Sequence, residues 1–267
     1  MGFARFPNVA IPSVYWGLPT LLHPPNCCET HAVVQKLVQA DSPSDRPSDR
    51  GQLVCDIHSG ETPLASVGAS VRKSIDDWLC GDLEFAMLHA CNAVDGTASK
   101  LHPSLGSNAR FTGLLRDNYA IFGPMGLPGI NLEDTRWPIK VDRPKAPGGL
   151  PDIADVIYGI HRCTHGHGGE LPDGFGLWPD AAGPDRNTRF SVERGKIQMS
   201  DRVIFGLLGV AVLSPANIGQ SVPVGYHLTF AGTILAINEW WGRSTDFLEL
   251  AALEVLPSVI IDFKHWR

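Results

Sequence analysis

The chain has 267 residues, of which 43% are hydrophobic and 19% are charged, and its formal net charge is −6. This length and composition are typical of a globular protein with a full hydrophobic core. The negative charge argues against a protein that coats a nucleic-acid duplex with a broad basic face, but it permits an enzyme that grips one phosphate.

The N-terminal sequence does not resemble a signal peptide, because Pro12 and Pro19 interrupt its apolar stretch. The sequence holds no apolar run of about 18 residues of the kind that spans a membrane. We therefore expect a cytoplasmic protein without a membrane partner. The six cysteines include no CxxC pair, and we expect Cys80 and Cys91 to be reduced, buried thiols within apolar helical patterns.

We predict two regions. Residues 1–60 form an N-terminal extension, in which the polar, proline-rich repeat at 41–50 is a flexible linker. Residues 61–267 form the folded domain. Its first two helices are expected at 64–79 and 82–101 and make a hairpin, with a glycine turn at Gly81, Asp82 as the N-cap of the second helix and Pro103 ending it.

The rest of the domain is predicted to be mainly α, with long loops and minor β structure. An apolar helix at 203–213 must be buried, and Gly206 and Gly209 indicate close packing against it. The other expected elements are helices at 108–122, 152–165, 234–241 and 245–255, a long loop at 123–150 with a short strand at 137–141, and strands at 190–192 and 226–230.

The densest group of chemically useful side chains ends the helix expected at 152–165. It reads His161-Arg162-Cys163-Thr164-His165-Gly166-His167. At about 100° per residue, Arg162 lies almost opposite the apolar stripe of this helix. The stripe consists of Ile153, Val156, Ile157, Ile160 and Thr164, and the opposite, polar face carries Asp155, Tyr158 and His165 beside Arg162.

Arginine and histidine together suit phosphoryl chemistry. A guanidinium binds phosphate oxygens and stabilises the charge that accumulates on them. An imidazole titrates near neutrality and can remove or donate a proton. On RNA the ribose 2′-OH supplies the nucleophile, so the reaction needs neither a metal nor another cofactor.

The segment Arg162-Cys-Thr-His-Gly-His167 resembles the R-x4-6-H motif of the HEPN superfamily of helical ribonucleases and toxins. The resemblance implies a HEPN-like helical bundle and a homodimer with a composite, metal-independent RNase site. In that site Arg162 binds the phosphate, His167 is the general acid/base, and Asp95 on an earlier helix supports the pair. It further implies RNA as substrate, a toxin or defence role, and a cognate antitoxin or regulator as partner.

Alternatives remain open. His165 is a rival base, because a continuous helix would bring it closer to the face of Arg162. The cations could instead only complement the carbonyls at a helix C-terminus, in a non-catalytic helical interaction module. A zinc site is a third reading, in which His161 and His165 share a helix face and His89 or His102 completes the ligand set.

Overall fold

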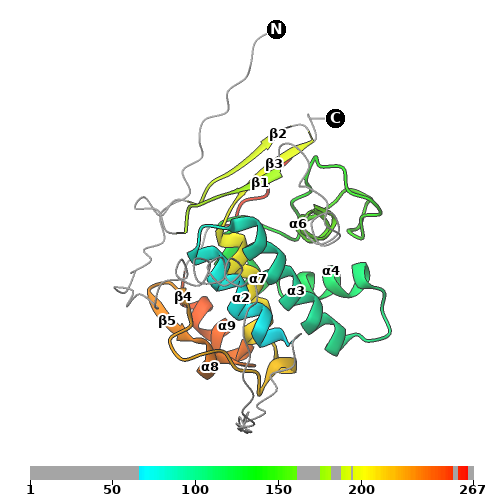
Figure 1. The fold of residues 1–267 in the computed structure, drawn as a ribbon. Coiled ribbons are helices and arrows are strands. Elements are labelled where there is room, and N and C mark those ends of the chain that lie inside the picture. The colour runs from blue at the N-terminus through cyan, green and yellow to red at the C-terminus, as the bar shows by residue number, and fades with distance from the viewer. Residues whose placement is uncertain (1–65, 161–174, 182–187, 194, 255–257, 264–267) are drawn as a thin grey trace, which may run out of the picture. The chain divides into compact units, whose positions relative to one another are not determined.

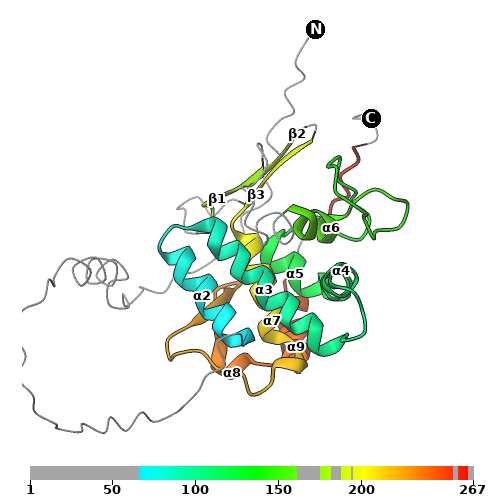
Figure 2. The ribbon, with the colours of Figure 1, turned by 45° about the vertical axis from the view of Figure 1, so that its right-hand side comes forward.

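The computed structural model describes residues 66–160, 175–181, 188–193, 195–254 and 258–263. Figures 1 and 2 show their arrangement. The elements in chain order are α2 (Val67–Leu79), α3 (Leu83–Leu101), α4 (Ser107–Asp117), α5 (Tyr119–Gly126), α6 (Ile153–Ile157), β1 (Phe175–Trp178), β2 (Phe190–Glu193), β3 (Lys196–Ser200), α7 (Arg202–Leu213), the 3-10 turn η3 (Pro215–Asn217), β4 (His227–Phe230), β5 (Thr233–Ala236), α8 (Ile237–Trp240) and α9 (Ser244–Ala252).

Helices α2 and α3 form the predicted hairpin and lie side by side (Figures 1 and 2). The side chain of Ser66 caps α2 by accepting a hydrogen bond from the amide of Ala69 at 3.0 Å. Gly81 makes the turn with a φ of 81°, a conformation that favours glycine. Asp82 then caps α3 by accepting from the amide of Phe85, as predicted.

Helix α7 is the buried centre of the fold and packs against α2, α3 and α5. Its glycines allow a close approach to α5, because a Cβ atom at Gly206 would lie 2.8 Å from the ring of Phe122 and 3.0 Å from the Cα of Gly126. The predicted close packing is thus confirmed. Within the described ranges, no helix is both long enough and apolar enough to cross a membrane.

The described residues form two sheets, so the prediction of a mainly α, HEPN-like helical bundle is wrong; the described part of the domain is mixed α/β. Strand β3 pairs in parallel with β1 and antiparallel with β2, in the order β1-β3-β2. Leu177, Met199 and Phe190 are directly opposite one another across these strands. Strands β4 and β5 form a separate antiparallel pair.

The missed strands have physical explanations. Strand β1 has four residues, all partly exposed, and therefore shows no alternation of apolar and polar residues. Strand β3 alternates only over its first four residues, with Ile197 and Met199 buried and Lys196 and Gln198 more exposed; Ser200 is buried as well, and the strand immediately precedes the start of α7. The strands predicted at 190–192 and 226–230 are confirmed as β2 and β4.

Three further predictions are corrected. The helix expected at 108–122 is two helices that meet at Asn118, whose side-chain Nδ2 donates to the carbonyl of Leu114. The strand expected at 137–141 does not form; the amide of Trp137 instead donates to the carbonyl of Pro151 at 2.8 Å. The helix expected at 234–241 begins as strand β5, and only Ile237–Trp240 is helical.

We predict that Gly206→Ala lowers the free energy of unfolding by about 1–3 kcal/mol, because the added methyl group overpacks the contact between α7 and α5. Gly113→Ala on α4 is the matched control, since a Cβ there meets no atom within 4 Å. It should raise stability by about 0.5–1 kcal/mol. Urea unfolding measures both, and an equal effect of the two substitutions would contradict the close packing.

Candidate functional site

The predicted site lies beyond the C-terminal end of α6. Arg162, His165 and His167, with the rest of the 161–167 cluster, lie outside the described residues. The α-helix spans Ile153–Ile157, and residues 158–160 continue it with π-helical geometry. The structure therefore describes the helix that directly precedes the cluster in the sequence, which we call the base of the predicted site.

The apolar stripe of α6 faces the core as predicted. Its four described members are each at most 4% exposed: Ile153, Val156, Ile157 and Ile160. Asp155 does not follow the prediction. It was expected on a polar face beside Arg162, but it is only 3% exposed and hydrogen-bonds within the protein.

The N-terminus of α6 is held by Arg116 of α4. Arg116 donates from Nε to Asp152 Oδ2 at 2.6 Å and from Nη2 to Asp152 Oδ1 at 2.9 Å. Its Nη2 also lies 2.9 Å from Asp155 Oδ1. One guanidinium thus pairs with two buried carboxylates through short, charge-assisted bonds. Asp152 is also the N-cap of α6 and accepts a hydrogen bond from the amide of Asp155.

The charges in this cluster stabilise one another. Burial opposes the charged state of Arg116, but its bonds to Asp152 raise the pKa of the guanidinium above its ordinary value. Burial likewise opposes the charged carboxylate of Asp152, yet the hydrogen bond from Arg116 keeps its pKa below the usual range. Burial next to this carboxylate raises the pKa of the Tyr119 hydroxyl. All three groups therefore keep their charge states at neutral pH.

Asp155 also ties the long loop before α6 to the cluster. Its carboxylate accepts hydrogen bonds from the amides of Lys145 and Ala146 at 2.8 to 3.0 Å. These bonds satisfy backbone donors that burial would otherwise leave without partners. The loop predicted at 123–150 is therefore pinned near its C-terminal end.

Asp95, the fourth predicted site residue, lies on α3 and pairs with Arg110 of α4. Arg110 Nε lies 3.2 Å from Asp95 Oδ1, and Nη2 donates to Oδ2 at 3.3 Å. Because α4 also carries Arg116, the two ion pairs link α3 to α4 and α4 to α6. The structure thus connects Asp95 to the base of the predicted site through α4.

The two histidines proposed to complete a zinc site have other surroundings. His89 Nε2 lies 3.6 Å from Asp77 Oδ2, and burial lowers the pKa of this imidazole. His102 is the C-cap residue of α3. In the part of the chain that the structure describes, no three His, Cys, Asp or Glu side chains gather in a way that could hold a metal ion.

Sequence reasoning missed a pair of buried carboxylates that follow the parallel strands β1 and β3. Asp201 accepts hydrogen bonds from Trp78 Nε1 at 2.7 Å and from the amides of Asp180 and Ala181 at 2.9 and 2.7 Å. Asp180 in turn accepts from the backbone amide and Nε of Arg189. The signal was an aspartate soon after each strand, but β1 and β3 themselves were not predicted.

Asp201 holds the two residues Asp180 and Ala181, which come soon after β1, in place. Asp201 is 0% exposed, so its carboxylate cannot touch a substrate. Burial raises the pKa of Asp201 above its ordinary value, although its hydrogen bonds act in the opposite direction. Asp201 occupies the N-cap position of α7, but its side chain makes no capping bond there.

Comparison with known proteins identifies the family. The model of the Rv1289 family matches residues 66–267. The chain belongs to the Rv1289 family. Two of its relatives are the uncharacterized proteins Rv1289 of Mycobacterium tuberculosis and Mb1320 of Mycobacterium bovis. Each is 42% identical to the chain over 198 residues, which cover 74% of the chain and 93% of the relative. No solved structure matches.

The Rv1289 family match begins at Ser66, the residue that caps α2. It extends over the Arg116 cluster and over the sequence of the 161–167 cluster. The family region thus contains both the anchored base of α6 and the side chains that the sequence singled out.

We predict that Arg116→Met lowers the free energy of unfolding by about 3–5 kcal/mol, because it leaves two buried carboxylates without a counter-charge. Urea unfolding at neutral pH measures the loss. Arg72→Met is the control: its pair with Asp76 is half exposed at 4.0 Å, and its loss should cost less than about 1 kcal/mol. Equal costs for the two substitutions would contradict the anchoring role of Arg116.

We also predict a pH signature for Asp201. Because its folded-state pKa is raised, the folded chain holds more protons than the unfolded chain above about pH 4, so the free energy of unfolding falls as pH rises through that window. Asp201→Asn should remove this component of the slope in urea melts taken between pH 4 and 7. Asp142→Asn, on a side chain that is 94% exposed, should leave the slope unchanged. A wild-type slope in Asp201→Asn would refute the assignment.

Proposed function

We propose that the chain is a metal-independent endoribonuclease of the cytoplasm that works as a homodimer, with Arg162 binding the scissile phosphate and His167 acting as general acid/base. The observation that carries the proposal is the spacing from Arg162 to His167 directly beyond α6. The mixed α/β fold differs from a helical bundle, so the proposal rests on the chemistry of these residues and on the anchoring of α6, not on a shared architecture.

The proposed chemistry needs only the chain and the RNA. An imidazole removes the proton from a ribose 2′-OH, and the oxygen attacks the adjacent phosphorus. The bond to the 5′-oxygen breaks, and this oxygen takes up a proton as it leaves. The products carry a 2′,3′-cyclic phosphate and a 5′-OH. Arg162 stabilises the charge on the phosphate oxygens during the transfer, and His165 is the alternative base.

The described contacts support a positioned site. Side chains that act on a phosphate must be held within a fraction of an ångström of the productive geometry. The bonds of Arg116 to Asp152 and Asp155 fix the base of α6. Asp95 contributes through Arg110 and α4, so we assign it a positioning role. A toxin or defence role, with a cognate antitoxin or regulator as partner, belongs to the same proposal.

The test incubates the full chain with single-stranded RNA in the presence of EDTA. We expect cleavage that leaves 2′,3′-cyclic phosphate ends. Arg162→Ala and His167→Ala should each slow it about 10²- to 10⁴-fold, the usual contribution of such groups. His102→Ala, at the end of α3, is the histidine control and should cleave at the wild-type rate.

The outcomes separate the alternatives. A loss in His165→Ala, with His167→Ala fully active, moves the role of the base to His165. Activity that neither Arg162→Ala nor His167→Ala changes would refute the site. A wild-type chain that binds RNA or protein without cleaving RNA would favour the non-catalytic interaction module.

A further inference from the structure

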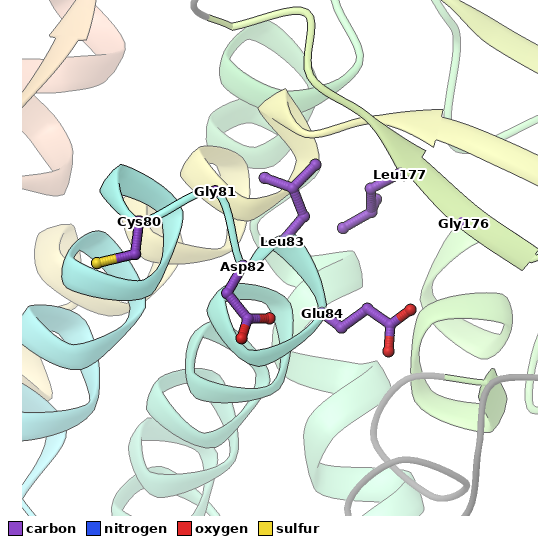
Figure 3. A pocket seen from close by; sticks show the side chains of 7 residues that line it. All are labelled: Cys80, Gly81, Asp82, Leu83, Glu84, Gly176 and Leu177. Atoms are coloured by element: carbon purple, nitrogen blue, oxygen red, sulfur yellow. The ribbon is translucent and has the colours of Figure 1, made fainter. Parts of the chain in front are cut away.

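A depression of about 550 Å³ lies between the α2–α3 turn and strand β1 (Figure 3). Leu83 of α3 and Leu177 of β1 lie close to each other across it, and the carboxylates of Asp82 and Glu84 lie beside them. Its volume falls in the range of ligand sites, about 300–1,000 Å³. None of these four residues belongs to the proposed ribonuclease site.

The depression combines an apolar floor with negative charge. Asp82 and Glu84 are exposed, and none of the described residues that line the depression is basic. Two large apolar side chains flank its lining residues in the chain, Leu79 at 42% exposure and Phe85 at 50%. Exposed apolar surface rimmed by charge marks an interaction site, and the sign of the charge indicates a basic partner.

The chain itself contains a sequence with the complementary chemistry. Lys264-His265-Trp266-Arg267 carries two permanent cations around an indole. Tryptophan and arginine dominate binding energy at protein interfaces, because they bury a large amphipathic surface. Lysine and arginine can pair with Glu84 and Asp82 while the indole covers the leucines.

We propose that the depression binds residues 264–267 of a second copy of the chain. If each copy inserts this sequence into the depression of the other, the contact is reciprocal and closes into a twofold dimer, not an open chain of molecules. Every side-chain contact then occurs twice, which doubles the effect of a substitution on the dimer.

The test is a charge swap in the full chain, read as the dimer dissociation constant by analytical ultracentrifugation. Glu84→Lys should weaken the dimer at least about tenfold, because an attractive contact becomes repulsive at two sites. Lys264→Glu with Arg267→Glu should weaken it similarly. Combining all three substitutions should restore much of the affinity, as expected for groups in direct contact.

Glu249→Lys is the control, because it reverses an exposed charge on α9. It should leave the dimer dissociation constant unchanged. Thermal melts of every variant show that the fold is intact. The proposal is overturned if the wild-type chain is monomeric at micromolar concentration, or if the combined variant is as weak as the single reversals added together. No step of the test involves RNA, so the cleavage assay fails or succeeds separately.

Discussion

The guanidinium of Arg116 is the interaction on which the arrangement of α4, α6 and the preceding loop depends. It occupies the space between two buried carboxylates that could not remain charged there without it. Both acids also organise backbone: Asp152 caps α6, and Asp155 receives the amides of the long loop. One cation thereby fixes a helix start and a loop end, and a residue without a permanent charge could not replace it.

The constraint extends in both directions along the fold. Through Arg110, helix α4 is tied to Asp95 of α3, and α3 packs against the buried helix α7. Through Asp152 and Asp155, the same helix α4 sets where α6 begins. The buried stripe of α6 then fixes its rotation about its axis. The sequence that carries Arg162 and His167 therefore follows a firmly held helix, and the proposed ribonuclease site would require such support.

The elements best predicted from the sequence are those whose signals are local. Gly81 with Asp82 specifies the hairpin turn, and the uninterrupted apolar run of α7 specifies burial. Strands β1 and β3 were missed because a short strand takes its stability from pairing with a distant segment, as Leu177 pairs with Met199. The role of Asp155 was misjudged for the same reason: helical periodicity places a residue on a face, but it does not reveal that Arg116, 39 positions earlier, occupies that face. Asp95 was named from the family resemblance, whereas its pairing with Arg110 depends on how α4 packs.

We propose that Arg116 positions the residues beyond α6 for RNA cleavage. The most direct test of this proposal is the single-turnover cleavage rate of Arg116→Met, at a temperature and urea concentration where circular dichroism shows the variant to be folded. We expect a rate at least about tenfold below that of the wild-type chain, because a small misplacement of catalytic groups slows the reaction strongly. A folded Arg116→Met variant that cleaves RNA at the wild-type rate would contradict it.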